Sequence, residues 1–208
     1  MIGVFLSSNA YAQIIQMEER VEDYLFQGRE DIVRGFTWDL PKSIIKQNEK
    51  GQLMDETDQA LFFFDFVRGA RAAIGYEFTD EDQLWRVSVF NEHNYKNPQD
   101  RIEDLLSMQV ILERRYGEPT EERFLWRNER GQNIPEYWGY AVYQANLAIE
   151  IIWKFEETDV ILSLKSPRLY EPEFKIDFEK RSEREKREMK ATTPPPLLLE
   201  GAENPLNP

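Results

Sequence analysis

The sequence predicts an α+β protein in which two helix-plus-antiparallel-meander halves follow one another along the chain. Stretches of alternating apolar and polar residues, typical of half-buried strands, recur in both halves. In each half they follow a stretch whose apolar residues are three and four apart, as on one face of a helix. This matching order is consistent with a duplicated α-β-β-β unit, and equally with one continuous sheet grown by accretion.

The first predicted elements are short. Residues 13–27 have the apolar spacing of an amphipathic helix, and residues 32–37 are expected to be extended. A short helix should follow, because Asp39 is a suitable N-cap, Pro41 fits the first turn and Gly51 fits a C-terminal cap.

The rest of the first half, which should extend over about residues 28–95, changes to a period of two. Residues 60–92 alternate apolar and polar side chains, with breaks at 68–69 and 80–82. They predict a three-stranded antiparallel meander.

The second half should cover about residues 96–178 and begin with the clearest helix, over 97–116. Asn97 is its expected cap, and Gly117 is its expected stop. Strands are then expected at 123–127, 137–144, 148–156, 160–165 and 174–178.

Residues 179–208 differ in composition from the predicted α+β domain over 13–178. The segment EKRSEREKREMK has no apolar stripe, so it can form a solvated helix through Glu/Lys and Glu/Arg pairs but should bury nothing. The following TPPPLLLEGAENPLNP is Pro-rich. We therefore expect a charged and then disordered tail.

Composition excludes several kinds of partner and site. The net charge of -13 argues against nucleic acid, because binding to phosphate backbones requires clustered Lys and Arg. No run is long and apolar enough to insert into a membrane. The chain has no Cys and one His, His93, which excludes disulfides, thiolate sites and multi-His metal centres.

The N-terminus carries a possible export signal. Ala10-Tyr11-Ala12 follows an apolar run, and small residues at the first and third positions before the cut are what signal peptidase accepts, which would make Gln13 the new N-terminus. Residues 1–12 are thus interpreted as the remnant of a signal peptide. A soluble periplasmic or secreted protein is expected, without a lipid anchor since Cys is absent. The alternative is an apolar segment of a cytosolic protein.

No catalytic, metal or cofactor residues are predicted. His93 has no Ser signature to accompany it, and the acidic clusters at 55–58 and 80–82 lack the alternating spacing of a calcium loop.

Aromatic residues are the only candidate binding site. Trp126, Tyr137, Trp138 and Tyr140 could present flat rings to a sugar or a peptide. Alternation would instead place about half of the whole aromatic set, which also includes Tyr143 and Trp153, in the core, and burial in the core is the interpretation we favour for these residues.

One resemblance extends over about residues 32–170. VRGFTWDLPKSIIKQNE, a helix ending in ERRYGEP, and then FLW, AIEIIW and VILSLKS resemble a loose set of small exported bacterial proteins of unknown function. The chain is also weakly similar to the helix-plus-meander architecture of small outer-membrane assembly lipoproteins and the β-lactamase-inhibitor-like fold. It departs from these in having Asp39 where Gly is usual, and in lacking a lipidated Cys. The resemblance brings no catalytic residues.

Taken together, these observations predict an exported bacterial envelope protein that acts as a non-catalytic protein-binding or scaffold module. Two alternatives remain. One is a carbohydrate-binding protein or carboxylate-dependent hydrolase that uses the aromatic face from Trp126 to Tyr140, and the other is a cytosolic adaptor. Two close carboxylates with shifted pKa values in a pocket beside exposed aromatics would favour the hydrolase.

Overall fold

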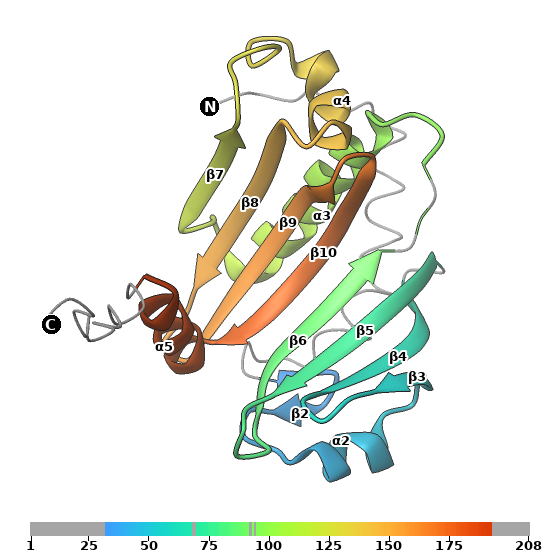
Figure 1. Cartoon of the computed structure of the whole chain (residues 1–208), viewed down its shortest axis with the longest axis vertical. Coiled ribbons are helices and arrows are strands. Elements are labelled where there is room, and N and C mark those ends of the chain that lie inside the picture. The colour runs from blue at the N-terminus through green and yellow to red at the C-terminus, as the bar shows by residue number, and fades with distance from the viewer. Residues whose placement is uncertain (1–31, 68–69, 92, 94, 193–208) are drawn as a thin grey trace, which may run out of the picture.

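Strands from both halves join in one eight-stranded antiparallel sheet, in the order β3-β4-β5-β6-β10-β9-β8-β7, and β1 and β2 form a separate two-stranded sheet (Figure 1). The computed structural model describes residues 32–67, 70–91, 93 and 95–192. In chain order the elements are β1 (Ile32–Val33), β2 (Phe36–Thr37), α2 (Lys42–Asn48), β3 (Gln52–Glu56), β4 (Ala60–Val67), β5 (Ala70–Phe78), β6 (Leu84–Asn91), α3 (Asp100–Tyr116), β7 (Glu121–Trp126), η1 (Pro135–Tyr137), α4 (Trp138–Tyr143), β8 (Leu147–Lys154), β9 (Thr158–Arg168), β10 (Glu171–Lys180) and α5 (Arg181–Thr192). The predicted α+β class with an antiparallel sheet is therefore confirmed.

The two halves occupy corresponding positions in this sheet. Each half contains a helix followed by four strands of the large sheet that pair with their neighbours in sequence, with η1 and α4 inserted between β7 and β8 in the second half. The last strands of the halves, β6 and β10, pair with each other. The first strands, β3 and β7, form the two edges of the sheet. One continuous sheet does not decide whether the halves arose by duplication, which stays a prediction.

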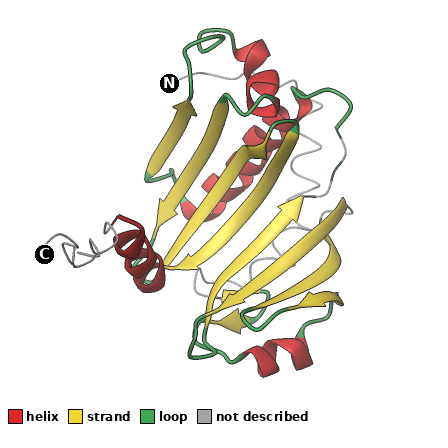
Figure 2. Ribbon diagram, in the orientation of Figure 1, coloured by secondary structure: helices red, strands yellow, loops and turns green. Residues whose placement is uncertain are grey.

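Alternation along the strands separates an apolar core face from a polar face. In β10, Phe174, Ile176 and Phe178 belong to the core, and the intervening Lys175 and Asp177 point to the opposite side. Figure 2 shows α3 behind the sheet and α5 in front of it, so the two long helices cover different faces. The hairpin β1–β2 and α2 contribute Phe36, Trp38 and Ile45 to the same core.

A buried ionic cluster attaches this hairpin to the sheet. Arg34 lies in the turn between β1 and β2 with φ of 55°, and its guanidinium contacts both carboxylate oxygens of Glu49. It also donates to the Tyr76 hydroxyl at 3.1 Å and to Asp65 at 3.0 Å. Burial alone would raise the pKa of Glu49, but hydrogen bonds from Arg34 and Tyr76 lower that pKa below its usual range. Burial beside this carboxylate raises the pKa of Tyr76.

The predicted start and end of the first short helix are wrong in detail. Pro41, not Asp39, occupies the N-cap position of α2, and Glu49, not Gly51, is its C-cap. Asp39 has a left-handed backbone with φ of 65°, and its carboxylate accepts from Lys180 at 2.6 Å. The residue is therefore used for a long-range ion pair rather than for capping.

The strand predicted over 137–144 is also wrong, because this segment forms the end of η1 and then α4. Ala141 and Val142 are buried, and Gly139 packs so closely on Pro98 that a Cβ atom would lie 2.4 Å from the Pro98 carbonyl oxygen. Aromatic residues at 137, 138, 140 and 143 match both a period of two and a helical period, and packing on α3 selects the helix.

The charged segment forms α5, and the expectation that it buries nothing is wrong. The Arg184 side chain is 14% exposed and bonds to Asp159 of β9, while Arg187 lies over the Trp85 ring at 4.1 Å. Long cationic side chains can cover apolar surface with their stems while their heads form ion pairs. The Pro-rich end, the helix expected over 13–27, and Ala10, Ala12 and Gln13 all lie outside the described residues.

Candidate functional site

Aromatic side chains from β7, η1 and α4 form one continuous group on the core side of the sheet, beside its edge. We call Phe124, Trp126, Tyr137, Trp138 and Tyr140 the aromatic surface. Trp126, Tyr137 and Trp138 are half-buried and pack against the core, whereas Phe124 is 41% exposed and Tyr140 is 45% exposed. The four aromatics predicted from the sequence, Trp126, Tyr137, Trp138 and Tyr140, thus all lie in β7, η1 or α4.

Ring contacts hold this surface in a fixed arrangement. Trp138 is central, with its ring centroid 5.4 Å from that of Phe124 and 6.4 Å from that of Trp126. Tyr137 stacks on Tyr140 with an interplanar angle of 17°. Aromatic pairs at these separations stabilise one another beyond the effect of area burial. The exposed rings of Phe124 and Tyr140 are therefore held in position by their contacts with half-buried rings.

The loop before η1 supports these rings through specific hydrogen bonds. The Trp138 indole N–H donates to the Gln132 carbonyl oxygen at 3.2 Å, and the Tyr137 hydroxyl donates to Gln144 at 3.1 Å. Gly131 lies directly under Tyr137, where a Cβ atom would come within 2.2 Å of the ring, and its φ is 82°. Glycine is required here for both the backbone conformation and the space.

The outer edge of β7 lies next to the aromatic surface and pairs with no other strand in the described part of the chain. The Arg127 N–H donates to the Asn146 carbonyl oxygen at 2.9 Å. Backbone groups of an edge strand point alternately toward and away from the neighbouring strand, so the odd-numbered residues of β7 are those that bond to β8. The backbone N–H and C=O groups of Glu122, Phe124 and Trp126 therefore point away from the sheet. Unpaired groups of this kind are a template for another strand.

Sequence reasoning missed Phe124 as a member of the surface. It is two residues before Trp126 on the same strand, so the alternation that identifies one could have identified the other. Of the two neighbouring aromatics, Trp153 is 1% exposed and belongs to the core, and Tyr143 contacts Tyr170 at 5.0 Å.

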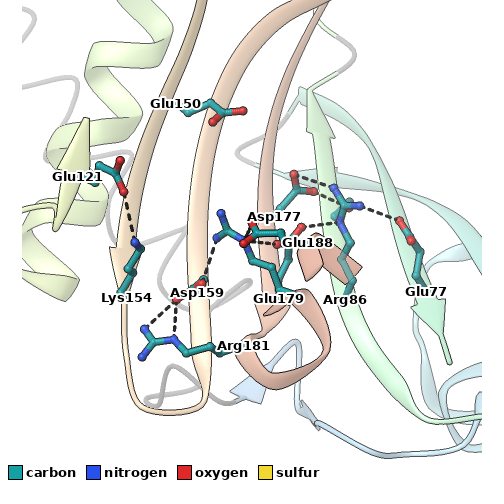
Figure 3. A network of polar contacts seen from close by, with 12 residues as sticks. Glu77, Arg86, Glu121, Glu150, Lys154, Asp159, Asp177, Glu179, Arg181 and Glu188 are labelled. Atoms are coloured by element: carbon teal, nitrogen blue, oxygen red, sulfur yellow. Dashed lines mark hydrogen bonds and ion pairs between the residues drawn. The ribbon is translucent and has the colours of Figure 1, made fainter. Parts of the chain in front are cut away.

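The polar face of the sheet carries a separate network of charges under α5 (Figure 3). Arg86 of β6 lies between Asp177 at 3.0 Å, Glu179 at 3.2 Å and Glu77 at 3.4 Å. Further along, Asp159 bonds to Arg181 and Arg184 of α5, at 2.9 and 3.0 Å. The network joins β5, β6, β9, β10 and α5.

Two carboxylates of this network have pKa values shifted in opposite directions. Burial would raise the pKa of Asp177, but the positive charges of Arg86 and Lys175 and a hydrogen bond from Ser88 lower it. Burial raises the pKa of Glu179, and Arg86 only partly offsets this. Both carboxylates line a cavity of about 260 Å³ under α5.

The carboxylate cavity and the aromatic surface lie on opposite faces of the sheet. Trp126 stands opposite Leu147, a core residue, whereas the neighbouring Arg123 stands opposite Glu150, a residue that lines the cavity. The hydrolase hypothesis requires carboxylates and exposed aromatics in one pocket. The arrangement of these residues does not provide that combination.

The remaining candidates considered from the sequence are His93 and the acidic side chains. His93 is exposed and packs edge-on against Tyr95 at 4.6 Å. Within residues 32–67, 70–91, 93 and 95–192, no three His, Cys, Asp or Glu side chains are grouped so that they could hold a metal ion. No helix in these ranges has the length and apolar character needed to cross a membrane.

Comparison with known proteins gives little further information. No family model matches the sequence, and neither does any curated protein. Among solved structures, the chain is similar to a DUF4309 family protein, YjgB, from Bacillus subtilis. The match has a TM-score of 0.40 and 8% sequence identity, and it covers 79% of this chain and 96% of that one.

Proposed function

We propose that this chain is a non-catalytic protein-binding module that accepts an extended segment at the outer edge of β7, over the aromatic surface. The observation that supports this most strongly is the combination of outward-pointing backbone groups at Phe124 with exposed rings beside it. Backbone hydrogen bonds would supply affinity, and alternate side chains of the segment would contact Phe124 and Trp138. Trp and Tyr are frequent in the energetic centres of protein interfaces.

A peptide-display selection on the full chain tests this proposal. We expect recovered peptides to have apolar residues at alternating positions, because every second side chain of an added strand faces the aromatic surface. Trp138→Ala should weaken their binding tenfold or more, which corresponds to about 1.4 kcal/mol. Phe124→Lys should weaken it to a similar extent.

The control is the other edge of the sheet. Leu53→Lys changes an exposed apolar residue of β3, which is 40% exposed, and should leave peptide binding unchanged. Recovery of peptides whose affinity is the same for Phe124→Lys and for the unchanged chain would contradict the proposal, as would a selection that yields no binder when the chain is monomeric.

We also propose that the protein works in the bacterial envelope after removal of residues 1–12. The support is the Ala10-Tyr11-Ala12 pattern and the resemblance to exported proteins. N-terminal sequencing of the protein from fractionated cells should give a mature chain that begins at Gln13. Full-length chain with Met1 in the cytoplasm would instead support the cytosolic adaptor.

A further inference from the structure

One pair of opposite charges lies at equal distances on either side of Phe124 of β7, and its acidic member, Glu121, also contacts Arg123 at 2.6 Å and Lys154 at 3.3 Å in its own chain. Glu121 is three residues before Phe124 and Arg127 is three residues after it. Within the described part of the chain, no ion pair involves Arg127. A strand with opposite charges at equal distances from its centre is complementary to an antiparallel copy of itself.

We infer that the segment that β7 accepts is β7 of a second copy, paired antiparallel with Phe124 opposite Phe124 of the partner subunit. This inference rests on the proposed use of the β7 edge and names its occupant. The outward backbone groups of Glu122, Phe124 and Trp126 would exchange hydrogen bonds with those of the partner subunit. A two-fold axis through the midpoint of the strands closes the assembly, as in most homodimers.

Side-chain charges select this register over its neighbours. With Phe124 at the axis, Glu121 lies opposite Arg127 of the partner subunit, and this pair occurs twice by symmetry. A shift of two residues in one direction places Arg123 opposite Arg127 of the partner subunit, and in the other direction it places Arg123 opposite its own copy. Like charges directly opposite each other destabilise a strand pair.

The same pairing also covers the exposed apolar residues. The two-fold axis is perpendicular to the sheet, so both aromatic surfaces lie on one face and the two Phe124 rings become neighbours. On the other face Leu125, which is 53% exposed, lies opposite Arg123 of the partner subunit and can pack on its aliphatic stem. The sheet would continue through both copies, which removes one exposed edge from each.

Sedimentation velocity of the full chain over a range of micromolar concentrations tests the inference by charge reversal. The unchanged chain should form dimers. Glu121→Arg alone and Arg127→Glu alone should each weaken dimerisation about tenfold, because each places like charges opposite one another twice. The double variant Glu121→Arg/Arg127→Glu should dimerise several-fold more tightly than either single variant, since it exchanges the positions of the charges. It should remain weaker than the unchanged chain, because an arginine at 121 also lies beside Arg123 and Lys154 of its own chain.

Phe124→Lys should give a monomer, and Leu53→Lys on the other edge should remain dimeric. A chain that is monomeric throughout the range overturns self-pairing, as does a double variant no better than the single ones or equal dissociation by Leu53→Lys. If the chain is monomeric but display selection still yields peptides that require Phe124, only self-pairing fails and the proposed function stands.

Discussion

Arg86 of β6 and Asp177 of β10 form an ion pair of 3.0 Å across the junction where the two halves of the sheet meet. The Asp177 side chain is 5% exposed, and Ser88 and Lys175 also bond to it, at 2.6 and 2.9 Å. Removal of one partner from such a pair leaves the other charge buried without compensation.

Arg86→Met should therefore destabilise the protein by about 3–5 kcal/mol. The loss arises mainly because Asp177 and Glu179 lose their shared cation, which leaves Lys175 as the cation beside Asp177 and Arg184 as the cation beside Glu179. Urea unfolding followed by circular dichroism would measure it. Addition of Asp177→Asn to Arg86→Met should cost less than the sum of the two single substitutions, since the two side chains contact each other directly.

The matched control is Arg168→Met. Arg168 is 81% exposed and its contact with Glu171 is 3.8 Å long, so its loss should change stability by no more than about 0.5 kcal/mol. Equal effects of the two arginine substitutions would show that the junction does not depend on Arg86.

Asp177→Asn and Glu179→Gln should differ in their dependence on pH. The folded-state pKa of Asp177 is lowered, so its contribution to stability is complete above the unfolded pKa of about 4 and is lost as the pH falls toward the folded value. The folded-state pKa of Glu179 is raised, so its favourable contribution exists at low pH and is lost as the pH rises through that value.

At pH 7 we therefore expect Asp177→Asn to destabilise the protein more than Glu179→Gln does. The difference should shrink below pH 4, where the stabilising charge of Asp177 is progressively lost. Urea unfolding at both pH values is the measurement. A difference that is independent of pH would contradict the assigned directions of the two shifts.

Gly131→Ala should disturb the aromatic surface more than a simple backbone effect would. A methyl group there meets the Tyr137 ring, so Tyr137 must move away from Tyr140, and intrinsic fluorescence and stability should both change. Gly117→Ala is the control, because Gly117 has a similar φ of 81° but nothing within 4 Å of the added atom. That control should lose about 1–3 kcal/mol through backbone strain, because its ψ of -168° lies in a region that only glycine adopts readily, and it should leave the contact between Tyr137 and Tyr140 unchanged. Identical effects would mean that the contact with Tyr137 relaxes freely.

Most strands of the large sheet could be predicted from the sequence because they are encoded by their own alternation, but β3, whose five residues are all exposed, was not predicted. The meander over β4, β5 and β6 is an example, since its turns interrupt the pattern within a few residues. The pairing of β6 with β10 could not be predicted, because nothing local specifies which strands meet across 85 or more residues of chain, the separation between the paired Phe90 and Lys175. The ion pair between Arg34 and Glu49 could not be predicted either, because it also depends on tertiary contacts.

Most residues of the aromatic surface could be predicted from the sequence, but the conformation of the segment that carries three of them could not. Trp126, Tyr137, Trp138 and Tyr140 were identifiable as a dense aromatic group, yet α4 was not identifiable as a helix. It is a short segment whose conformation depends on close packing of Gly139 against Pro98, a tertiary contact. The contacts of α5 were missed because Arg184 and Arg187 carry charges and give no apolar stripe.

The strand order has a consequence for biosynthesis. Of the described strands, β10 leaves the ribosome last, yet it occupies an interior position between β6 and β9. Until β10 has been translated, a nascent chain holds both of those strands with open hydrogen-bonding edges. Premature termination before residue 171 should therefore leave two unjoined meanders, each a candidate for chaperone capture or degradation, instead of a protein that lacks only a peripheral strand.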